Sequence, residues 1–445
     1  KSYDLFVHLS KTGSLDKTIL EAMAGGMRVL SSNDASQGFL PSELIFDQDD
    51  GAELAGKIKL ISTHNVDSKL RQYVVENHSL DKLIDKIYAE GISGRITIYP
   101  FPYSSKSNKY IGLLYSNIDG GVCDGVRFSV KDPHNSFLRM FLSGLRGRSV
   151  IHIHWTNTIY GSRFLLRTLF LMAFNFSILC LLKLRGCRIV WTMHNYYPHD
   201  SEWVWLDRIG QRILFKMADA VTIHQKGEQL KLASKHKNKN IVFIPHGNYV
   251  GAYGPLSNNW VEMRRKFDLK EDDIVMISLG AVKPYKKIEN IITALKKAGS
   301  GRVTLLIAGK CDREYAENLR NLIRGENNIE LICDFIPDEK IPDYLTIADY
   351  SVFWYDNSVL TSGGIVLSLS YGVPVIARNT PAADLIENGK NGFKFNDEKE
   401  LTEVIEKLPN MPKFGRDEVV ATVNHLSWDK VSDEFIKLYS LLWRN

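Results

Sequence analysis

Short apolar runs alternate with amphipathic stretches along most of the chain, which is the pattern of a parallel sheet with crossover helices. The first runs are "RITIYPF", "VIHIHW", "RIVWTMHN", "AVTIH" and "IVFIPHG", and each predicts a strand. After the turn-rich "NYVGAYGPLSNN" come "IVMISLGAV", "VTLLIAG", "IELICDF", "YSVFWY" and "PVIARN". The pattern predicts two doubly wound α/β domains, residues 95–253 and 254–445, with a cleft at the carboxyl ends of their strands. We expect the amphipathic helices 398–408 and 428–443 to cover the second domain.

The beginning of the chain repeats a pattern found near its end. "YDLFVHLSKTGSLDKTILEAMAGGMRVLSSN" and "ADYSVFWYDNSVLTSGGIVLSLSYGVPVIARN" both predict strand, helix and strand, with Gly26 aligned on Gly372. We interpret residues 1–94 as a partial domain of the same type as residues 254–445. A chain of 445 residues also exceeds the size of one ordinary core.

Composition and cysteine spacing favour a soluble protein of a reducing compartment. The chain is 44% hydrophobic and 24% charged, and its five cysteines include no C-x-x-C pair. Neither a zinc site nor a disulfide framework is indicated, and a cytoplasmic location fits best. The chain begins at Lys1 without a basic and apolar leader, which we interpret as a truncated start without a signal peptide.

The positive charge is concentrated in the first predicted domain. The net charge is +5, but thirteen Lys or Arg and only three acidic residues lie between Arg95 and His199. This excess predicts attraction to an anionic surface such as a bilayer, and the alternative is a purely solubilising role. The apolar run "FLLRTLFLMAFNFSILCLLKL" has 15 uncharged residues between Arg167 and Lys183, fewer than the roughly 20 that span a bilayer. A buried helix is favoured there, and an interfacial helix is the alternative.

Two loops of the second predicted domain follow strands and open helices. In "SLGAVKPYKKIENIITAL", Gly280 ends a strand and Lys286 comes just before the next helix. In "DNSVLTSGGIVLSLSYGVPVIARN", a helix opens with Ser362, Gly363 and Gly364. Helix N-termini present free N–H groups and the positive end of the helix dipole. Both loops therefore predict contacts to phosphate oxygens.

Candidate acid–base residues follow a strand of the first predicted domain. In "WTMHNYYPHD", His194 ends the strand, and His199 and Asp200 lie in the loop after it. A histidine or carboxylate at this edge of the sheet can deprotonate an acceptor hydroxyl. We therefore name these three residues as catalytic candidates.

Further polar residues lie at the ends of two other strands. In "IHIHWTN", His154, Trp155 and Asn157 are near the carboxyl end of the strand and are candidates for binding an acceptor. His152 is better explained by structural packing. In "IPHGNY", His246 stands where the chain leaves the first domain, and we expect it to line the cleft.

The order of these segments over residues 95–445 resembles the GT-B glycosyltransferases, in particular the family-four-like group that builds bacterial surface polysaccharides. Residues 1–94 resemble the end of another such enzyme. The resemblance implies two Rossmann-like domains facing a cleft, a UDP- or GDP-linked sugar as donor and a lipid-linked saccharide as acceptor. It also implies that Lys286 binds the diphosphate and that His194 contacts the donor sugar.

The chain departs from the family pattern in the donor site. The family's arginine falls on Ala281 here, so Lys283 is expected to replace it. The family's two glutamates fall on Val359 and Leu367, and both acids are missing. Asp384, where the family often has a glutamate, is expected to contact the ribose.

The opening segment has one of the two glutamates that are missing from the second predicted domain. Its equivalent of Leu367 is Glu21, while its equivalent of Val359 is Gly13. Without a partner domain this segment cannot form a cleft, and we expect it to be inactive.

These observations predict a hexosyltransferase that needs neither metal nor cofactor, because Lys286, a second cation and helix N-termini can stabilise the leaving diphosphate. No D-x-D pair suited to a metal–diphosphate follows a strand. We expect no nucleic-acid partner and a location at the inner face of the cytoplasmic membrane. The alternative is a catalytically silent binding or scaffold protein. A nicotinamide-dependent oxidoreductase is disfavoured, because "RITIYPFPYSSKSNKYIG" lacks the G-x-G-x-x-G loop.

Overall fold

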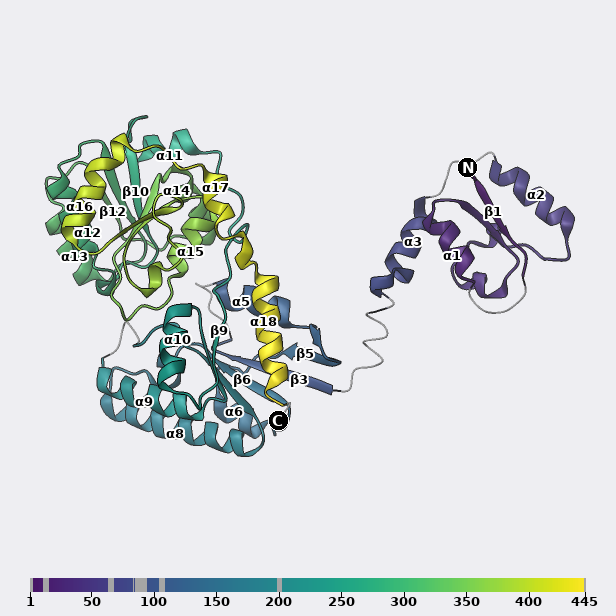
Figure 1. Cartoon of the computed structure of the whole chain (residues 1–445), viewed down its shortest axis with the longest axis horizontal. Coiled ribbons are helices and arrows are strands. Elements are labelled where there is room, and N and C mark those ends of the chain that lie inside the picture. Colours follow the sequence, from purple (N-terminus) through teal and green to yellow (C-terminus); the bar gives the residue numbers. More distant parts are fainter. Residues whose placement is uncertain are drawn as a thin grey trace. The chain divides into compact units, whose positions relative to one another are not determined.

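The computed structural model of the chain describes residues 3–10, 16–62, 68–82, 84, 94–103, 109–197 and 202–443 (Figure 1). The chain forms two compact units, Lys1–Ser93 and Gly94–Asn445, which we call the N-terminal unit and the main unit. The N-terminal unit has a core of its own, centred on Ile19, Met23 and Val29.

The N-terminal unit begins as a strand, a helix and a parallel strand. These are β1 (Leu5–His8), α1 (Lys17–Ala24) and β2 (Arg28–Ser31), followed by α2 (Gly51–Ser62) and α3 (Ser68–His78). The N-cap residue of α1, Asp16, accepts a hydrogen bond from the Thr18 backbone at 2.9 Å. Glu21 is exposed and pairs with Lys17 at 3.2 Å, and Gly13 lies outside the described residues. That this unit derives from a second transferase stays a prediction.

The main unit opens with a seven-stranded sheet in the order β4-β5-β3-β6-β7-β8-β9. Apart from the pair formed by β4 and β5, which is antiparallel, neighbouring strands are parallel. The strands are β3 (Gly94–Phe101), β4 (Val122–Cys123), β5 (Val126–Val130), β6 (Ser149–Ile153), β7 (Arg188–Thr192), β8 (Ala220–Ile223) and β9 (Ile241–Phe243). We call this sheet and its helices the first domain.

Helices cover both faces of this sheet, and each face has its own core. On one face, buried residues such as Leu179, Leu214 and Ile189 join the sheet to α6 (Phe137–Leu142), α7 (Asn157–Tyr160), α8 (Leu165–Leu184) and α9 (Val204–Met217). On the other face, Leu114 and Phe435 join it to α5 (Lys109–Ile118) and α18 (Trp428–Leu441). Helix α10 (Lys226–Lys235) connects β8 to β9.

The second domain has a six-stranded parallel sheet in the order β12-β11-β10-β13-β14-β15. Its strands are β10 (Ile274–Leu279), β11 (Val303–Ala308), β12 (Ile329–Ile332), β13 (Tyr350–Phe353), β14 (Val375–Arg378) and β15 (Gly392–Phe395). Its helices are α11 (Trp260–Lys266), α12 (Ile288–Ala298), α13 (Arg313–Leu322), α14 (Ile341–Ile347), α15 (Gly363–Ser370), α16 (Glu398–Lys407) and α17 (Arg416–Ala421). The prediction of two doubly wound α/β sheets is confirmed.

The expectation that the last helix covers the second domain is wrong. Helix α18 packs on the first domain, where Val431, Phe435 and Tyr439 enter the core beside α5. Ser432 donates a hydrogen bond to the Leu114 carbonyl at 3.0 Å. The amphipathic pattern shows that a helix has an apolar side, but it does not show which sheet that side meets. Because α18 follows the second domain in the chain and packs on the first, it fastens the two domains to each other.

The sequence indicates no disulfide framework, but the structure contains a disulfide. Cys311 and Cys333 form a disulfide, with their Cα atoms 5.1 Å apart. The two residues follow β11 and β12, which are neighbouring parallel strands paired through Ala308 and Ile332. The pairing of the strands brings together cysteines that are 22 residues apart in the sequence, so a search for close C-x-x-C spacing misses them.

Candidate functional site

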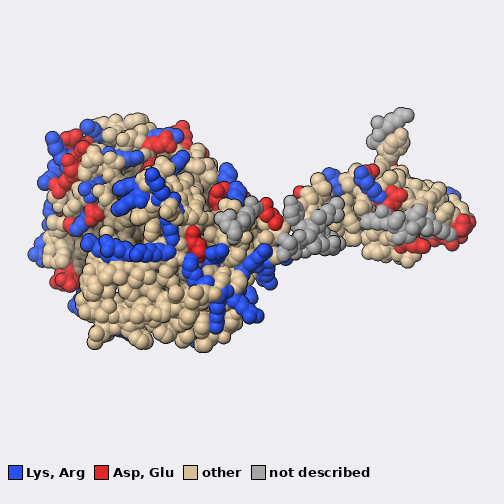
Figure 2. Space-filling model, turned by 60° about the horizontal axis from the view of Figure 1, so that its bottom comes forward, with Lys and Arg blue, Asp and Glu red and all other residues tan. Residues whose placement is uncertain are grey.

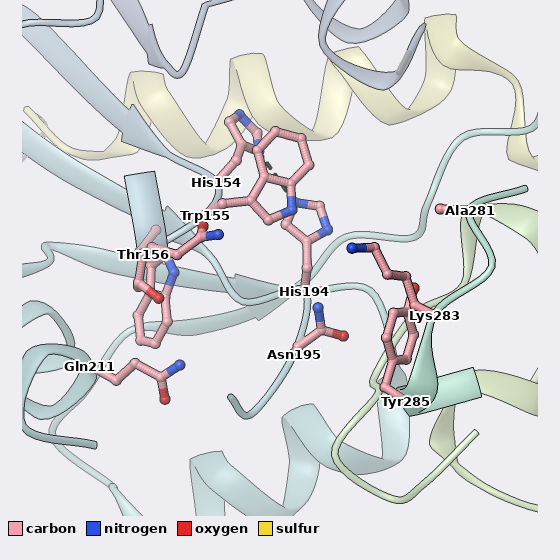
Figure 3. A pocket seen from close by; sticks show the side chains of 11 residues that line it. His154, Trp155, Thr156, His194, Asn195, Gln211, Ala281, Lys283 and Tyr285 are labelled. Carbon is pink, nitrogen blue, oxygen red and sulfur yellow. Dashed lines mark hydrogen bonds between the residues drawn. The ribbon is translucent and has the colours of Figure 1, made fainter. Parts of the chain in front are cut away.

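A pocket of about 230 Å³ lies between the two domains of the main unit (Figure 3). It lies at the carboxyl ends of β6, β7 and β10, which is where doubly wound sheets bind ligands. Backbone contacts bridge the domains beside it, because Asn195 pairs with Val359 and the Tyr196 N–H donates to the Ser358 carbonyl at 2.9 Å. The lining residues are His154, Trp155, Thr156, Asn157, Trp191, His194, Asn195 and Gln211 from the first domain and Ala281, Lys283 and Tyr285 from the second.

Five residues named from the sequence line this pocket together: His154, Trp155, Asn157, His194 and Lys283. The His194 ring stacks on the Trp155 indole with centroids 5.1 Å apart and an interplanar angle of 15°. Figure 3 shows the Lys283 ammonium extending from the second domain toward the side of the pocket that holds His194. His199 and Asp200, the other catalytic candidates, lie outside the described residues.

A chain of hydrogen bonds leads from the pocket into the first domain. Nε2 of His194 lies 3.4 Å from Nδ1 of His154, and Nε2 of His154 lies 2.7 Å from the Tyr115 hydroxyl. The same hydroxyl lies 2.5 Å from Nδ1 of His152, whose Nε2 lies 2.7 Å from the Thr192 hydroxyl. Each imidazole in this chain is held at a defined angle, and the tautomer of one ring constrains the next.

Burial keeps these histidines neutral. Removal from water lowers the pKa of His152, His154 and His194 well below the usual value of 6.5, and each neighbouring imidazole lowers it further. The pKa of His224 falls to about 4 and that of His246 to about 3, chiefly through burial. At neutral pH, His194 is therefore an unprotonated imidazole, which is the form that can accept a proton.

Lys286 is a buried cation in the loop before α12. It ends the short 3-10 helix Pro284–Lys286, and burial lowers its pKa to about 8. Among the described residues no carboxylate lies within salt-bridge distance of its ammonium. A Cβ atom at Gly280, whose φ is +103°, would lie 3.5 Å from Nζ, so the ammonium rests beside that glycine at the end of β10. An anion bound there would offset the cost of burying this charge.

Lys283 lies nearer to solvent than Lys286. Its ammonium pairs with the Asp312 carboxylate at 2.8 Å, and the residue lines the pocket next to Ala281. The loop that carries it is held against the neighbouring strand end, where Val282 pairs with Cys311. Lys283 thus places a second ammonium group, paired with Asp312, in the wall of the pocket.

The N-terminus of α15 lies deeper in the second domain. Ser362 caps this helix by accepting a hydrogen bond from the Ile365 N–H at 3.2 Å, and its hydroxyl donates to the Tyr355 hydroxyl at 3.1 Å. A Cβ atom at Gly364 would come within 2.9 Å of the Phe353 ring, so a glycine lets the helix approach β13 closely. Tyr355 stacks on Tyr285, which lines the pocket, with centroids 6.3 Å apart. These contacts connect the capped helix start to the pocket wall.

Sequence reasoning missed several polar atoms beside the strand ends. The side-chain oxygens of Asn195, Thr361 and Thr380 are buried without a hydrogen-bond partner among the residues that the structure describes. Unsatisfied buried oxygens are costly, and those beside a ligand site are commonly satisfied by the ligand. Their position directly after a strand or before a helix is the signal that could have identified them.

Four other residues singled out in the sequence do not line the pocket. Asp384 is exposed after the short 3-10 helix Pro381–Ala383 and is not part of the pocket lining. Val359 is 3% exposed and packs in an apolar core, and Leu367 packs at the edge of another. His246 is buried against Tyr110 and does not line the pocket. The positions where the family has glutamates are thus apolar contacts here.

Comparisons with known proteins agree with this fold. Residues 261–417 match the family model described as glycosyl transferases group 1. The chain is 21% identical to the GDP-mannose:glycolipid 4-beta-D-mannosyltransferase of Xanthomonas campestris pv. campestris, over 62% of this chain and 70% of that protein. Its fold is similar to that of Anabaena HepE in complex with UDP, with a TM-score of 0.58 and 15% identity, covering 78% of this chain and 100% of HepE. It is also similar to the sucrose-phosphate synthase of Thermosynechococcus elongatus, with a TM-score of 0.58 and 14% identity, covering 79% and 99%.

The main unit therefore has the two-domain GT-B fold of these structures, and part of its second domain matches the glycosyl transferases group 1 model. This match lies entirely within the second domain.

Proposed function

We propose that the main unit transfers a hexose from a UDP- or GDP-linked donor to a lipid-linked saccharide, in the synthesis of a bacterial surface polysaccharide. The observation that carries this proposal is Lys286, a buried ammonium with a lowered pKa beside Gly280 at the carboxyl end of β10. A cation buried without a carboxylate partner is expensive, and a diphosphate is the ligand that would stabilise it. The relative from Xanthomonas is named as using GDP-mannose and a glycolipid, and HepE binds UDP.

In this proposal the second domain holds the donor and the first domain holds the acceptor. Lys286, Lys283 and the N-terminus of α15 stabilise the charge that develops on the leaving diphosphate, so the reaction needs no metal ion. Neutral His194 accepts a proton from the acceptor hydroxyl or positions the donor sugar, with Trp155 packed against its ring. The lipid-linked acceptor places the protein at the inner face of the cytoplasmic membrane.

The test is a donor screen followed by a transfer assay. UDP, GDP and their hexose conjugates are titrated into the full chain, and a nucleotide that binds is then supplied as its sugar conjugate with membrane extracts as acceptor. Saturable binding with sugar incorporation into lipid supports the proposal. Sugar incorporation that is unchanged in Lys286→Ala contradicts it.

A silent binding or scaffold protein is the second candidate, and one observation favours it. Val359 and Leu367 are apolar contacts at the positions where the family has acidic residues. This candidate predicts a folded cleft without measurable affinity for any nucleotide sugar. The donor screen separates the two candidates.

A further inference from the structure

The outer side of the first domain carries exposed apolar side chains on two helices. On α8, Leu166 is 82%, Phe170 64% and Leu184 80% exposed. With Phe174 and Leu181, they recur every three to seven residues and therefore lie along one side of the helix. We call these five residues, together with Trp205 and Ile209 of α9, the apolar face.

A helix that is apolar on all sides is normally buried, but α8 is not. Only one third of its most apolar 18-residue window is buried. Figure 2 shows a broad area without charged side chains at the bottom of the main unit, where α8 and α9 lie in Figure 1. Large exposed apolar areas of this kind mark surfaces that bind a partner or a membrane.

Helix α8 is long and apolar enough to cross a bilayer, but its inner side packs against the first domain. Leu179 and Leu182 are fully buried against the sheet. Asn175 donates a hydrogen bond to the Ile159 carbonyl at 2.6 Å, and the Lys183 ammonium pairs with Asp219 at 2.7 Å. The helix is held lengthwise on the domain, so it can lie in a membrane interface but cannot span the membrane with the domain folded.

The exposed charges around the apolar face are mainly positive, although Glu202, which lies just before α9, is exposed and acidic, while Asp207 of α9 is buried. The sequence contains no Asp or Glu from Pro133 to His199. Exposed arginines flank the face at both ends of α8 and along α9: Arg163, Arg167, Arg185, Arg208 and Arg212. An apolar face with a basic border and an exposed tryptophan complements a membrane of anionic lipid. The apolar side chains would contact the acyl chains, and the guanidinium groups would pair with the anionic headgroups. Two copies of the same face would bring like charges together, which disfavours self-association.

We propose that the apolar face seats the main unit on an anionic bilayer, with α8 lying parallel to the membrane surface. This inference deepens the proposed function and rests on it for the lipid-linked acceptor. Helix α9 connects the two surfaces, because Gln211 lines the pocket while Trp205 and Ile209 belong to the apolar face. An acceptor anchored in the bilayer would therefore reach the first-domain side of the pocket along α9.

The test uses Cys180, an exposed cysteine on α8, as its reporter. In the full chain with Cys123→Ser, Cys180 is labelled with an environment-sensitive maleimide dye and mixed with vesicles of phosphatidylcholine and phosphatidylglycerol. We expect flotation with the vesicles and a blue shift of the dye. Phe170→Glu with Phe174→Glu should weaken vesicle binding roughly tenfold or more. Val261→Glu is the matched control, because Val261 is 71% exposed on α11 of the second domain.

Four results would overturn the inference. They are the absence of flotation, equal flotation of the double variant and the control, a Cys180 thiol shielded from the dye by the N-terminal unit, and a blue shift that grows with protein concentration without vesicles. Nucleotide titration of the same variants separates this inference from the proposed function. Normal nucleotide binding with lost flotation supports the surface, whereas flotation without any nucleotide binding refutes the proposed function and leaves the surface supported.

Discussion

Nε2 of His194 lies 3.4 Å from Nδ1 of His154, and this contact is the one through which the pocket meets the buried hydrogen-bond chain. When His194 donates this bond, the other nitrogen of its ring, Nδ1, keeps a lone pair for a proton from the acceptor. Nε2 of His154 then donates to the Tyr115 hydroxyl, which donates in turn to His152. With this direction of donation, the chain supports the tautomer of His194 that can act as a base.

Replacing His194 by alanine should lower turnover roughly 10²- to 10⁴-fold, the usual contribution of a general base. The fold should persist, because the buried ring of His194 lies at a strand end in the pocket wall and its loss leaves the two sheets intact. The affinity for nucleotide should change little. His425→Ala, an exposed histidine of the second domain, is the control, and full activity of His194→Ala would remove His194 from the reaction.

Tyr115 is a positioning residue in this account, because it touches His154 and not the pocket. Tyr115→Phe removes the hydroxyl that contacts Nε2 of His154 and Nδ1 of His152, so the hydrogen-bond chain that constrains the tautomer of His194 is broken. We expect kcat to fall and the acid limb of the pH–rate profile to move, while KM for the donor stays the same. A purely structural role would instead lower the thermal stability and leave the shape of the pH profile unaltered.

The buried histidines predict that acid destabilises the fold. Their folded-state pKa values lie below 6.5, at about 4 for His224 and about 3 for His246, so the unfolded chain binds more protons as the pH falls below 6.5. When the pH falls from 6.5 to 5, each of these two residues should lower the free energy of unfolding by up to about 2 kcal/mol. Urea denaturation at both pH values measures this loss. In His224→Gln the loss should be smaller, and an equal loss in the variant would contradict the assignment.

Lys286 should lower the stability of the free protein. Its folded pKa of about 8 lies below the ordinary value of 10.5, so the unfolded state binds more protons between these values and stability rises with pH across that window. Below pH 8 the cost is fully present. Lys286→Met should therefore raise the unfolding free energy at pH 7 by about 1–3 kcal/mol, with a smaller gain at pH 10. A variant less stable than the natural chain at pH 7 would show that the ammonium is stabilised by other groups.

The strands could be predicted where an unbroken apolar run marks a strand buried on both faces. The runs that end at Leu279 and Ala308 are of this kind, and both are strands of the second sheet. The strands β5 and β15 were missed, because "VRFSV" and "GFKF" interrupt the apolar pattern with charged residues. Strand β15 is an edge strand, and β5 is covered on its outer side only by the two-residue strand β4, so both need fewer apolar residues and their signal is weaker.

Contacts between distant segments could not be predicted from local patterns. The pairing of His154 with His194 depends on β6 and β7 being neighbours in the sheet, which the order of elements indicates. The contact of Tyr115 with these histidines depends on how α5 lies across the sheet. That contact is set by side-chain packing, for which the sequence of one chain carries no local signal.

Calorimetric titration of the full chain with UDP and GDP, repeated in Lys286→Ala, tests the central claim most directly. The account predicts saturable binding of one nucleotide, weakened by roughly 1.5–3 kcal/mol in the variant, as expected for a lost charge-assisted hydrogen bond. Binding to the natural chain should also weaken as the pH rises through 8, where Lys286 loses its proton. Lys297→Ala, at the opposite end of α12, is the matched control and should bind normally. Equal affinity in Lys286→Ala and the natural chain, or no binding of either nucleotide, would contradict the account.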